Sequence, residues 1–584
     1  MLIVGIAMFN RYYQRELQNL RELAADFSRM HPAAAPLLSG QSSDPDVERL
    51  LEGVAFLTGL LRNKLDDNLP EIIHGLTDSI LPHYLRPIPS TSIVVFAPKP
   101  SLQETMRVPA GTTLAANAVE GAVCRFQTCF DLEVHPLKLA AAETLRRAAE
   151  PECLRLQFQS TGPDLANLKI ERLCFYLGGS YVQATDLHWL LVRHVRRITV
   201  RSLIGGQPRH FSPAMLKPIG FLRQNALFPF PTQAFSGYRM LQEYFVLPQK
   251  YMIFELEGWH EWQQRGTGTG FEVILEMAPT PIPLPDLTAD QIFLYATPVV
   301  NLFAHEADPI QLDHRQEKVH VKASLHHAET LQVYGVERVT GIRQGTVEKT
   351  TYAPLNLFTP GRPETTVYQV VREVSPVSST VETHLLLTYP ADSTDPTREV
   401  LTIGLTCTNG TLPEKLRLGD ICQPTSDSPE LLTFQNILPA TAPIDPILAG
   451  KGIWKLLSHL SLNLLPLLNC EGLKEVLRLY LYPEGRDRVK TAANLKRVEG
   501  IAEVHTQPLD RLVKGHLMRG RQITLTVSQD HFAGMGDLFV FGSVLDEFFS
   551  QYSNMNSFTR LTINDLISGE TLAWPERIGD RPLI

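Results

Sequence analysis

The stretch of residues 81–96, LPHYLRPIPSTSIVVF, decides the fold because the pattern of apolar residues changes inside it. Upstream of it, apolar residues recur every three or four positions, which is the period of an amphipathic helix. Pro82 ends this pattern, because a proline cannot donate a helical hydrogen bond. Downstream, Ser92–Phe96 (SIVVF) is a short β-branched run of the kind found in strands. We therefore expect a helical N-terminal unit followed by β-rich units.

Two long helices are expected in the N-terminal unit, followed by a shorter one at Pro70–Leu81. Asp44 and Pro45 supply an N-cap residue and a proline at the first helical position of the second long helix. Two helices joined by a short loop pack antiparallel, and such a hairpin leaves more apolar surface than it can cover. The alternative is that this surface packs onto the chain's own β domain. The residues expected to bind a partner chain are Tyr13, Leu17, Leu20, Phe27, Leu50, Val54 and Leu57.

The central part of the chain is expected to be β-rich, with one helix at Gln183–Val195. Ala278–Pro285 (APTPIPLP) has a proline at every second position from Pro279, which predicts an extended connector. Ile292–Thr408 is predicted to be mostly β, and Pro424–Pro446 to be rich in turns. The strands expected before the connector are Ser92–Phe96, Leu154–Phe158, Leu173–Leu177, Lys250–Leu256 and Phe271–Glu276.

The C-terminal part alternates helical and strand patterns. Helices are expected at Ile453–Leu465 and Glu471–Leu481, and a strand at Gln522–Val527. A further helix carries an apolar seam of Leu538, Phe541, Leu545, Phe548 and Tyr552. The predicted fold class is therefore α+β and multidomain. The expected units are an N-terminal helical arm at 1–90, a β-rich domain with some helix at 91–285, a second β-rich domain at 286–450 and an α+β domain at 451–584.

The charge balance and the apolar runs exclude two classes of protein. Lys and Arg total 54 against 62 for Asp and Glu, and this net charge of -8 argues against a nucleic-acid partner. Met1–Ala7 is apolar but has no positive region before it and no cleavage site of small residues. We find no run long enough to cross a bilayer, and we expect a cytosolic chain without direct membrane insertion.

The sequence contains only weak matches to motifs of phosphate-binding, catalytic or metal-binding sites. Gly266–Gly270 lacks the Lys-Ser/Thr of a phosphate loop and is expected to be a hairpin loop. Asp44-Pro45-Asp46 has the pattern of a helix cap rather than of an acid/base pair. His326-His327 with Glu329 is the nearest approach to a metal cluster, but no further ligand stands at a recognised spacing. We therefore expect no catalytic, cofactor-binding or metal residues and no cofactor.

Longer blocks of sequence, spread in order along the chain, are recognisable. They include Phe9–Leu23 (FNRYYQRELQNLREL), Ser43–Leu57 (SDPDVERLLEGVAFL), Leu81–Ser92 (LPHYLRPIPSTS), Gly237–Phe245 (GYRMLQEYF), Pro298–Phe303 (PVVNLF) and Val544–Phe558 (VLDEFFSQYSNMNSF). Together these blocks resemble the TssF family (also ImpG/VasA), the baseplate wedge subunits of type VI secretion systems.

The resemblance implies a structural role and not an enzymatic one. TssF-like proteins assemble as two copies per TssG, together with TssK and TssE, so self-association within the wedge is also implied. Six wedges surround the spike protein VgrG and form a cytoplasmic platform, docked to the inner-membrane complex of a Gram-negative bacterium. The contractile sheath and tube polymerise on that platform. We accordingly expect the N-terminal helices to join TssG, in a bundle with a second TssF-like chain.

Two alternatives of other classes stay open at this point. One is a multidomain cytosolic enzyme with dispersed catalytic residues, which would show a pocket with two or more perturbed titratable groups. The other is a β-rich ligand-binding protein, which would show one apolar pocket and no helical arm.

Overall fold

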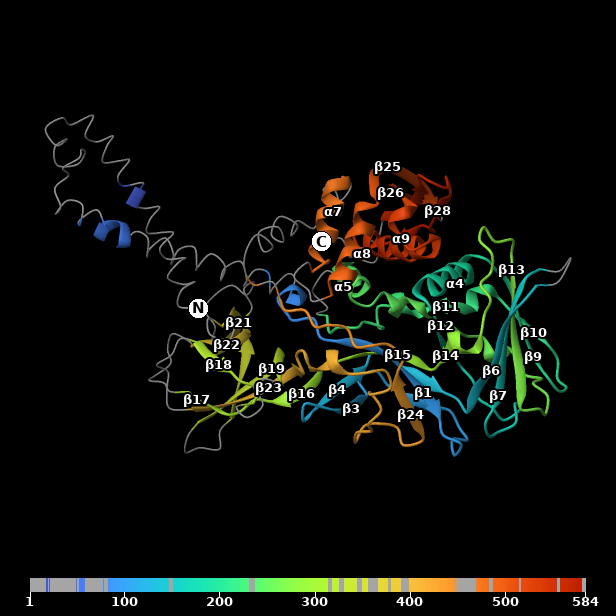
Figure 1. Ribbon diagram of the computed structural model, residues 1–584, viewed down its shortest axis with the longest axis horizontal. Coiled ribbons are helices and arrows are strands. Elements are labelled where there is room, and N and C mark those ends of the chain that lie inside the picture. Colours follow the sequence, from blue (N-terminus) through green and yellow to red (C-terminus); the bar gives the residue numbers. More distant parts are fainter. Residues whose placement is uncertain are drawn as a thin grey trace.

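Helices and several β-sheets together make up the protein in the computed structural model, so the expected α+β class is confirmed (Figure 1). The structure describes residues 17–18, 20, 49, 52–57, 77, 82–146, 151–230, 237–312, 318–324, 330–343, 349–355, 366–375, 380–389, 399–446, 448, 469–482, 487–513, 516–553 and 557–579.

Strand β1 (Thr91–Pro98) lies between two other strands of a sheet that gathers distant parts of the chain. Phe96 lies opposite Phe434 on one neighbour, and Thr91 lies opposite Val300 on the other. The strand expected at the end of the opening stretch is thus confirmed. In spatial order the sheet contains β24 (Leu432–Asn436), β1, β15 (Ala296–Val300), β4 (Ala122–Thr128) and β3 (Thr113–Val119).

Strand β24 was not expected in Pro424–Pro446, a stretch that the sequence predicts to be rich in turns. Its residues alternate between buried and exposed, with Leu432 and Phe434 facing the core. Period-2 alternation is the signal of a half-buried strand, but it covers only five residues here and is flanked by prolines. The pairing with β1, more than 300 residues away in sequence, supplies the hydrogen bonds that make this segment a strand.

Two further antiparallel sheets and one strand pair complete the central body. The strands expected at Leu154–Phe158, Leu173–Leu177 and Phe271–Glu276 are confirmed in them. One sheet orders β10 (Arg209–Phe211), β9 (Val195–Ser202), β13 (Gly270–Met277), β7 (Cys153–Ser160) and β6 (Leu137–Leu145). The other orders β11 (Leu216–Pro218), β12 (Ile253–Leu256), β8 (Leu173–Leu177) and β14 (Ile292–Leu294), and β2 (Met106–Val108) pairs with β5 (Leu132–Val134).

One local prediction in this body is confirmed only in part, and another is wrong. The strand expected at Lys250–Leu256 begins only at Ile253, because Pro248 starts a short 3-10 helix (Pro248–Met252) before it. Gly266–Gly270 is not a hairpin loop, since the strands before and after it, β12 and β13, belong to different sheets. Both differences concern where the chain turns, which depends on the strands available for pairing.

The eight-stranded sheet has an apolar core of its own, in which Val339, Leu385 and Ile403 are fully buried. The expected alternation in β22 is confirmed, with Thr383 and Leu385 on its buried face. In spatial order it contains β16 (Phe303–Glu306), β23 (Glu399–Thr408), β19 (Gln332–Arg343), β20 (Lys349–Pro354), β21 (Val367–Val374), β22 (Val381–Thr388) and β18 (Lys318–Val321), with β17 (Ile310–Leu312) also paired to β23.

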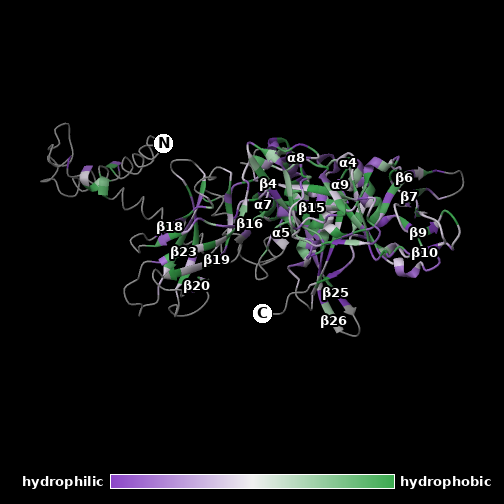
Figure 2. Cartoon of the chain, turned by 90° about the horizontal axis from the view of Figure 1, so that it is seen from below, coloured by the Kyte–Doolittle hydropathy of each residue, from purple (hydrophilic) through white to green (hydrophobic). Residues whose placement is uncertain are grey.

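The C-terminal module packs three helices against a mixed sheet. The expected apolar seam lies on α9 (Met535–Ser550), and its members up to Phe548 are fully buried. The hairpin of β25 and β26 projects from the body of the protein (Figure 2). The remaining elements are α7 (Cys470–Leu479), α8 (Arg488–Glu499), β25 (Ile501–Val513), β26 (His516–Val527), β27 (Ser557–Asp565), β28 (Thr571–Ala573) and β29 (Arg577–Ile578).

Two helices connect the central sheets to this module (Figure 1). Helix α4 (Tyr181–Arg193) begins where Ser180 accepts a hydrogen bond from the amide of Gln183, so the expected helix is confirmed two residues earlier than predicted. Every residue of α5 (Gly237–Val246) is buried. The remaining 3-10 helices lie at Pro82–Tyr84, Pro213–Met215, Ile219–Phe221, Trp259–Glu261, Ala289–Gln291, Leu412–Lys415 and Gln529–His531.

The division into four units stays a prediction. The sheet around β1 combines strands from before and after the boundary expected at 285/286. The helix expected at Ile453–Leu465 lies outside the described residues. Within the described part of the chain, no helix is long and apolar enough to cross a membrane.

Replacing Phe541 with alanine should destabilise the C-terminal module by about 3–5 kcal/mol, because a fully buried ring is lost and a cavity remains. The Phe541 ring lies 5.4 Å from that of Phe532 and 5.7 Å from that of Tyr244, so the module and α5 both lose a contact. Thermal unfolding followed by circular dichroism measures the change. Leu495→Ala is the control, because Leu495 is 43% exposed on α8. Equal stability of the two variants would contradict the described packing.

Candidate partner-binding surfaces and their support

The expected partner-binding residues lie between positions 13 and 57, where the structure describes residues 17–18, 20, 49 and 52–57. Leu17 and Leu20 are helical and half-buried. Val54 and Leu57 lie in a helical turn at 52–57 and are 37% and 61% exposed. The helical conformation expected at these positions is therefore present. Tyr13, Phe27 and Leu50 lie outside the described residues.

The side of this helical turn that is buried lies away from the expected binding surface. Ala55 is fully buried, whereas Phe56 is 47% exposed. Successive residues of a helix are separated by about 100° around its axis, so Ala55 faces a different direction from Val54 and Leu57. The turn thus presents large apolar side chains to solvent, which is the arrangement expected of a binding surface.

The C-terminal module is held on the central body by a close approach of α9 to α4. A Cβ atom added to Gly536 would lie 2.3 Å from the backbone of Asp186, so only glycine allows this contact. The Asp186 carboxylate accepts a hydrogen bond of 3.0 Å from the Gly536 amide at the start of α9. Burial raises the pKa of Asp186, and the hydrogen bond from Gly536 acts in the opposite direction.

A buried charge network lies beside this contact and links α4, α8 and α9. The fully buried Asp537 carboxylate accepts hydrogen bonds of 2.9 Å from both Tyr181 and Arg497. It also accepts one of 3.0 Å from the Ala533 amide. Burial raises the pKa of Tyr181, so its hydroxyl stays protonated and donates a hydrogen bond to Asp537. The network fixes the mutual placement of the three helices.

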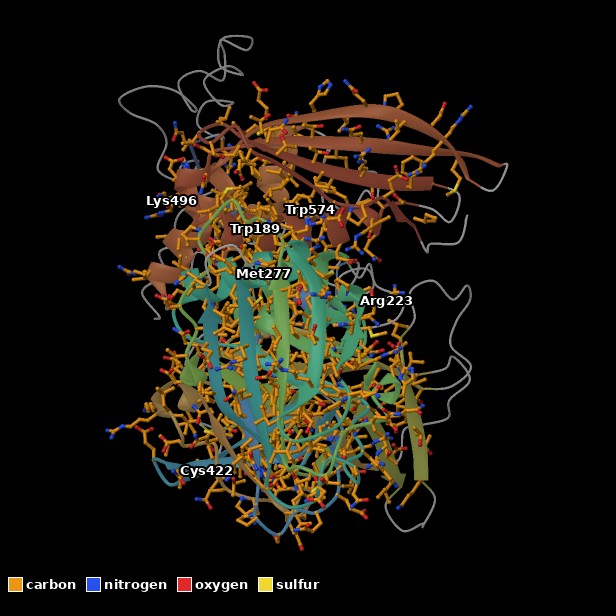
Figure 3. All side chains as sticks on the ribbon, turned by 90° about the vertical axis from the view of Figure 1, so that its right-hand side faces the viewer. Trp189, Arg223, Met277, Cys422, Lys496 and Trp574 are labelled. Atoms are coloured by element: carbon orange, nitrogen blue, oxygen red, sulfur yellow. The ribbon has the colours of Figure 1, made fainter. Side chains whose placement is uncertain are left out.

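Aromatic rings fill the rest of the same junction. Trp189 on α4 and Trp574 near the end of the chain lie where the C-terminal module meets the sheets (Figure 3). The Phe539 ring stacks on Trp574 at 5.4 Å and lies 6.1 Å from the ring of His188. Burial lowers the pKa of His188 to about 3, so this histidine is neutral and acts as a core residue.

A groove with a volume of about 380 Å³ opens between α5, α8 and the segment that follows β24. Lys490 donates a hydrogen bond to the Val246 carbonyl, and Asn494 donates one of 3.4 Å to the Phe245 carbonyl. These are carbonyls at the C-terminal end of α5, where a helix leaves acceptors without intrahelical partners. Burial lowers the pKa of Lys490 to about 8.

Comparison with known proteins gives the family. The family model described as "Type VI secretion system, TssF" matches residues 7–581. Type VI secretion system component TssF1 of Pseudomonas aeruginosa is 30% identical over 618 aligned residues, which cover 98% of each chain. The chain belongs to the TssF family.

Solved structures agree with this assignment. A chain of the TssK-TssF-TssG baseplate subcomplex aligns with a TM-score of 0.75 at 28% identity, covering 91% of this chain and 98% of that chain. A chain of the type VI secretion baseplate complex aligns with a TM-score of 0.61 at 24% identity, a likeness in fold that covers 98% of this chain and all of that chain. This TssF-family chain is a structural component of the type VI secretion baseplate and not an enzyme.

The perturbed groups in the groove have structural causes that agree with this role. Lys490 donates its hydrogen bond to a carbonyl at the end of α5, and Tyr181 donates its hydrogen bond to Asp537. Tyr482, whose pKa burial raises, accepts a hydrogen bond of 3.2 Å from Gln242. These groups therefore serve packing, and the enzyme alternative gains no support from them.

One cluster of possible metal ligands was missed by the sequence analysis. His320, Glu382 and His384 lie together on the eight-stranded sheet, although more than 60 residues separate the first from the others. Glu382 and His384 are two residues apart on one strand, so their side chains leave the same face of the sheet. This spacing is the sequence signal that could have indicated the cluster. The pair His326-His327 and Glu329 lie outside the described residues.

Replacing Asp537 with asparagine should destabilise the junction by about 3–5 kcal/mol, because the buried Arg497 would lose its ionic partner. Thermal unfolding and limited proteolysis of the full chain measure the effect, with faster cleavage expected in the C-terminal module. Glu499→Gln is the matched control, because Glu499 pairs with Arg478 at 2.7 Å with both side chains at least 35% exposed. Such a pair contributes about 0–1 kcal/mol. If the two variants lose the same amount of stability, the described role of Asp537 at the junction is contradicted.

Proposed function

We propose that this chain is a wedge subunit that joins TssG and TssK in the type VI secretion baseplate. The observation that carries the proposal is the full-length likeness, at 28% identity and a TM-score of 0.75, to a chain of the TssK-TssF-TssG subcomplex. The likeness extends over 98% of that chain and 91% of this one, which supports the same neighbours for this chain.

The N-terminal helices are the proposed site for TssG. Val54, Phe56 and Leu57 present apolar side chains that are between 37% and 61% exposed on one short stretch of helix. Three large apolar residues so close together on a surface helix are characteristic of helix-in-groove or bundle contacts. We place a second TssF-like chain in the same bundle, so that two copies share one TssG.

The remaining units supply separate surfaces for other neighbours. The finer architecture that we propose is a helical arm, β-rich central domains and an α+β C-terminal domain. The eight-stranded sheet has a core of its own, and the hairpin of β25 and β26 projects from another part of the molecule (Figure 2). Rigid units on one chain can hold several partners at fixed distances.

The wider assembly follows from this placement. We propose contacts with TssE and with the spike protein VgrG inside the assembled baseplate. The proposed location, with the rest of the baseplate, is the cytoplasmic side of the inner-membrane complex.

Replacing Leu50 and Leu57 with aspartate should abolish co-purification of TssG, because two charges would be forced into an apolar contact. The experiment is a pull-down of co-expressed TssG by the full chain, with circular dichroism to verify that the β-rich units remain folded. Glu52→Lys is the control, because Glu52 is exposed and points away from Leu57 on the helical turn at 52–57.

Retained TssG binding in the double aspartate variant would refute the assignment of this surface. If the surface instead packs onto the chain's own β domain, the variant unfolds at a lower temperature while TssG still binds. Loss of TssG by the Glu52→Lys control as well would mean that binding responds to any charge change on this helix, which would also count against the assignment.

A further inference from the structure

Strands β18 and β22 are neighbours at the edge of the eight-stranded sheet (Figure 1), and each carries a histidine. His320 on β18 lies directly opposite His384 on β22 in the antiparallel register. Glu382 is two residues before His384 on the same strand, so its side chain leaves the same face of the sheet. All three side chains are half-buried.

The geometry of the three side chains is close to that of a metal site. One ligand atom from each residue can be chosen so that all three lie within 4.8 Å of one another. The imidazole rings are stacked, with centroids 4.9 Å apart and an angle of 28° between them. Nε2 of His384 lies 4.0 Å from the nearer Glu382 oxygen. A tetrahedral zinc ion with bonds of about 2.0–2.1 Å holds its ligand atoms about 3.3 Å apart, so small side-chain rotations would close the site.

We propose that His320, Glu382 and His384 bind one divalent transition-metal ion, for which Zn²⁺ is the best match. Two imidazole nitrogens and one carboxylate oxygen are ligands that zinc accepts, and a water molecule completes a tetrahedral set. Mg²⁺ and Ca²⁺ fit poorly, because both require oxygen ligands. This proposal goes beyond the proposed function and does not depend on any partner protein.

The hydrogen bonding of the cluster leaves a ligand position available. Among the described residues, Nδ1 of His384 is buried without a hydrogen-bond partner. Such an atom is costly unless an ion or another group satisfies it. His384 contributes one ligand atom to the cluster, and either Nδ1 or Nε2 can serve as that atom. One nearby carboxylate is engaged elsewhere, because Glu373, which lies opposite Glu382 in register, forms an ion pair of 2.5 Å with Lys318.

A metal ion at this place would join an edge strand to its sheet. Strand β18 contains four residues and pairs, among the described strands, with β22 alone. A strand this short at an edge makes few hydrogen bonds, and a cross-strand metal bridge from His320 to His384 would hold it in register. The ion is thus inferred to have a structural role.

The test is a titration of the full chain, produced without a polyhistidine tag and stripped of metal with a chelator. Isothermal titration calorimetry with ZnCl₂ should give one strong site per chain. His320→Gln and His384→Gln should each weaken zinc binding by about tenfold or more, because each removes one of three ligands. Glu382→Gln is a milder change, which keeps the size of the side chain and should also weaken binding.

Two controls separate this cluster from other histidines. His260→Gln changes an exposed histidine on another part of the protein and should leave zinc affinity unchanged. The double variant His326→Gln/His327→Gln should likewise retain the site. Circular dichroism of the metal-free variants verifies folding, and if either histidine variant unfolds, the Glu382→Gln titration decides. No zinc binding by the native chain, or equal affinity in His384→Gln, would overturn the proposal.

A spectroscopic readout counts the histidine ligands directly. Electron paramagnetic resonance of the chain loaded with one equivalent of Cu²⁺ should show coupling to two imidazole nitrogens. His320→Gln should reduce this to one nitrogen, whereas His260→Gln should leave two. An unchanged nitrogen count in His320→Gln would place the metal at other residues and refute the assignment.

Discussion

The backbone contact between α4 and α9 is the constraint on which the arrangement of the molecule depends. At Gly536 the two helices approach so closely that an added methyl group would lie 2.3 Å from the backbone at Asp186. Helix α4 packs against strands of the central sheets, and α9 supplies much of the core of the C-terminal module. The distance between these two backbones therefore sets where the module and its projecting hairpin stand relative to the rest of the protein.

The charges at this contact serve placement more than stability. Burying Asp537 and Arg497 costs desolvation that their attraction approximately offsets, so the pair adds little to the free energy of folding. A displaced helix, however, would leave one charge buried and unpaired, which is strongly unfavourable. The network of Asp537, Arg497 and Tyr181 thus penalises other arrangements. A scaffold protein needs this property, because its surfaces must meet several neighbours at fixed positions.

The eight-stranded sheet is attached to the central body by a smaller polar contact. Asn301, at the end of β15, is fully buried and accepts hydrogen bonds from the Thr408 hydroxyl at 2.9 Å and the Asn409 amide at 2.7 Å. Its own amide donates to the Arg125 carbonyl at 2.7 Å. The sheet has a separate apolar core, so this contact joins two cores without merging them. The inferred metal site lies on the far strand pair of this sheet, away from the contact.

The sequence by itself determined the α+β class, the family and the elements with strong local patterns. Helices α4 and α9 and strands β1, β7, β8 and β13 are evident from the spacing of their apolar residues. Only the tertiary structure decided that β24 returns to β1, that Lys490 binds the end of α5, and that His320 meets His384. The physical reason is that each of these contacts joins residues far apart in sequence. Local periodicity reports which face of an element is buried but not which distant element covers it.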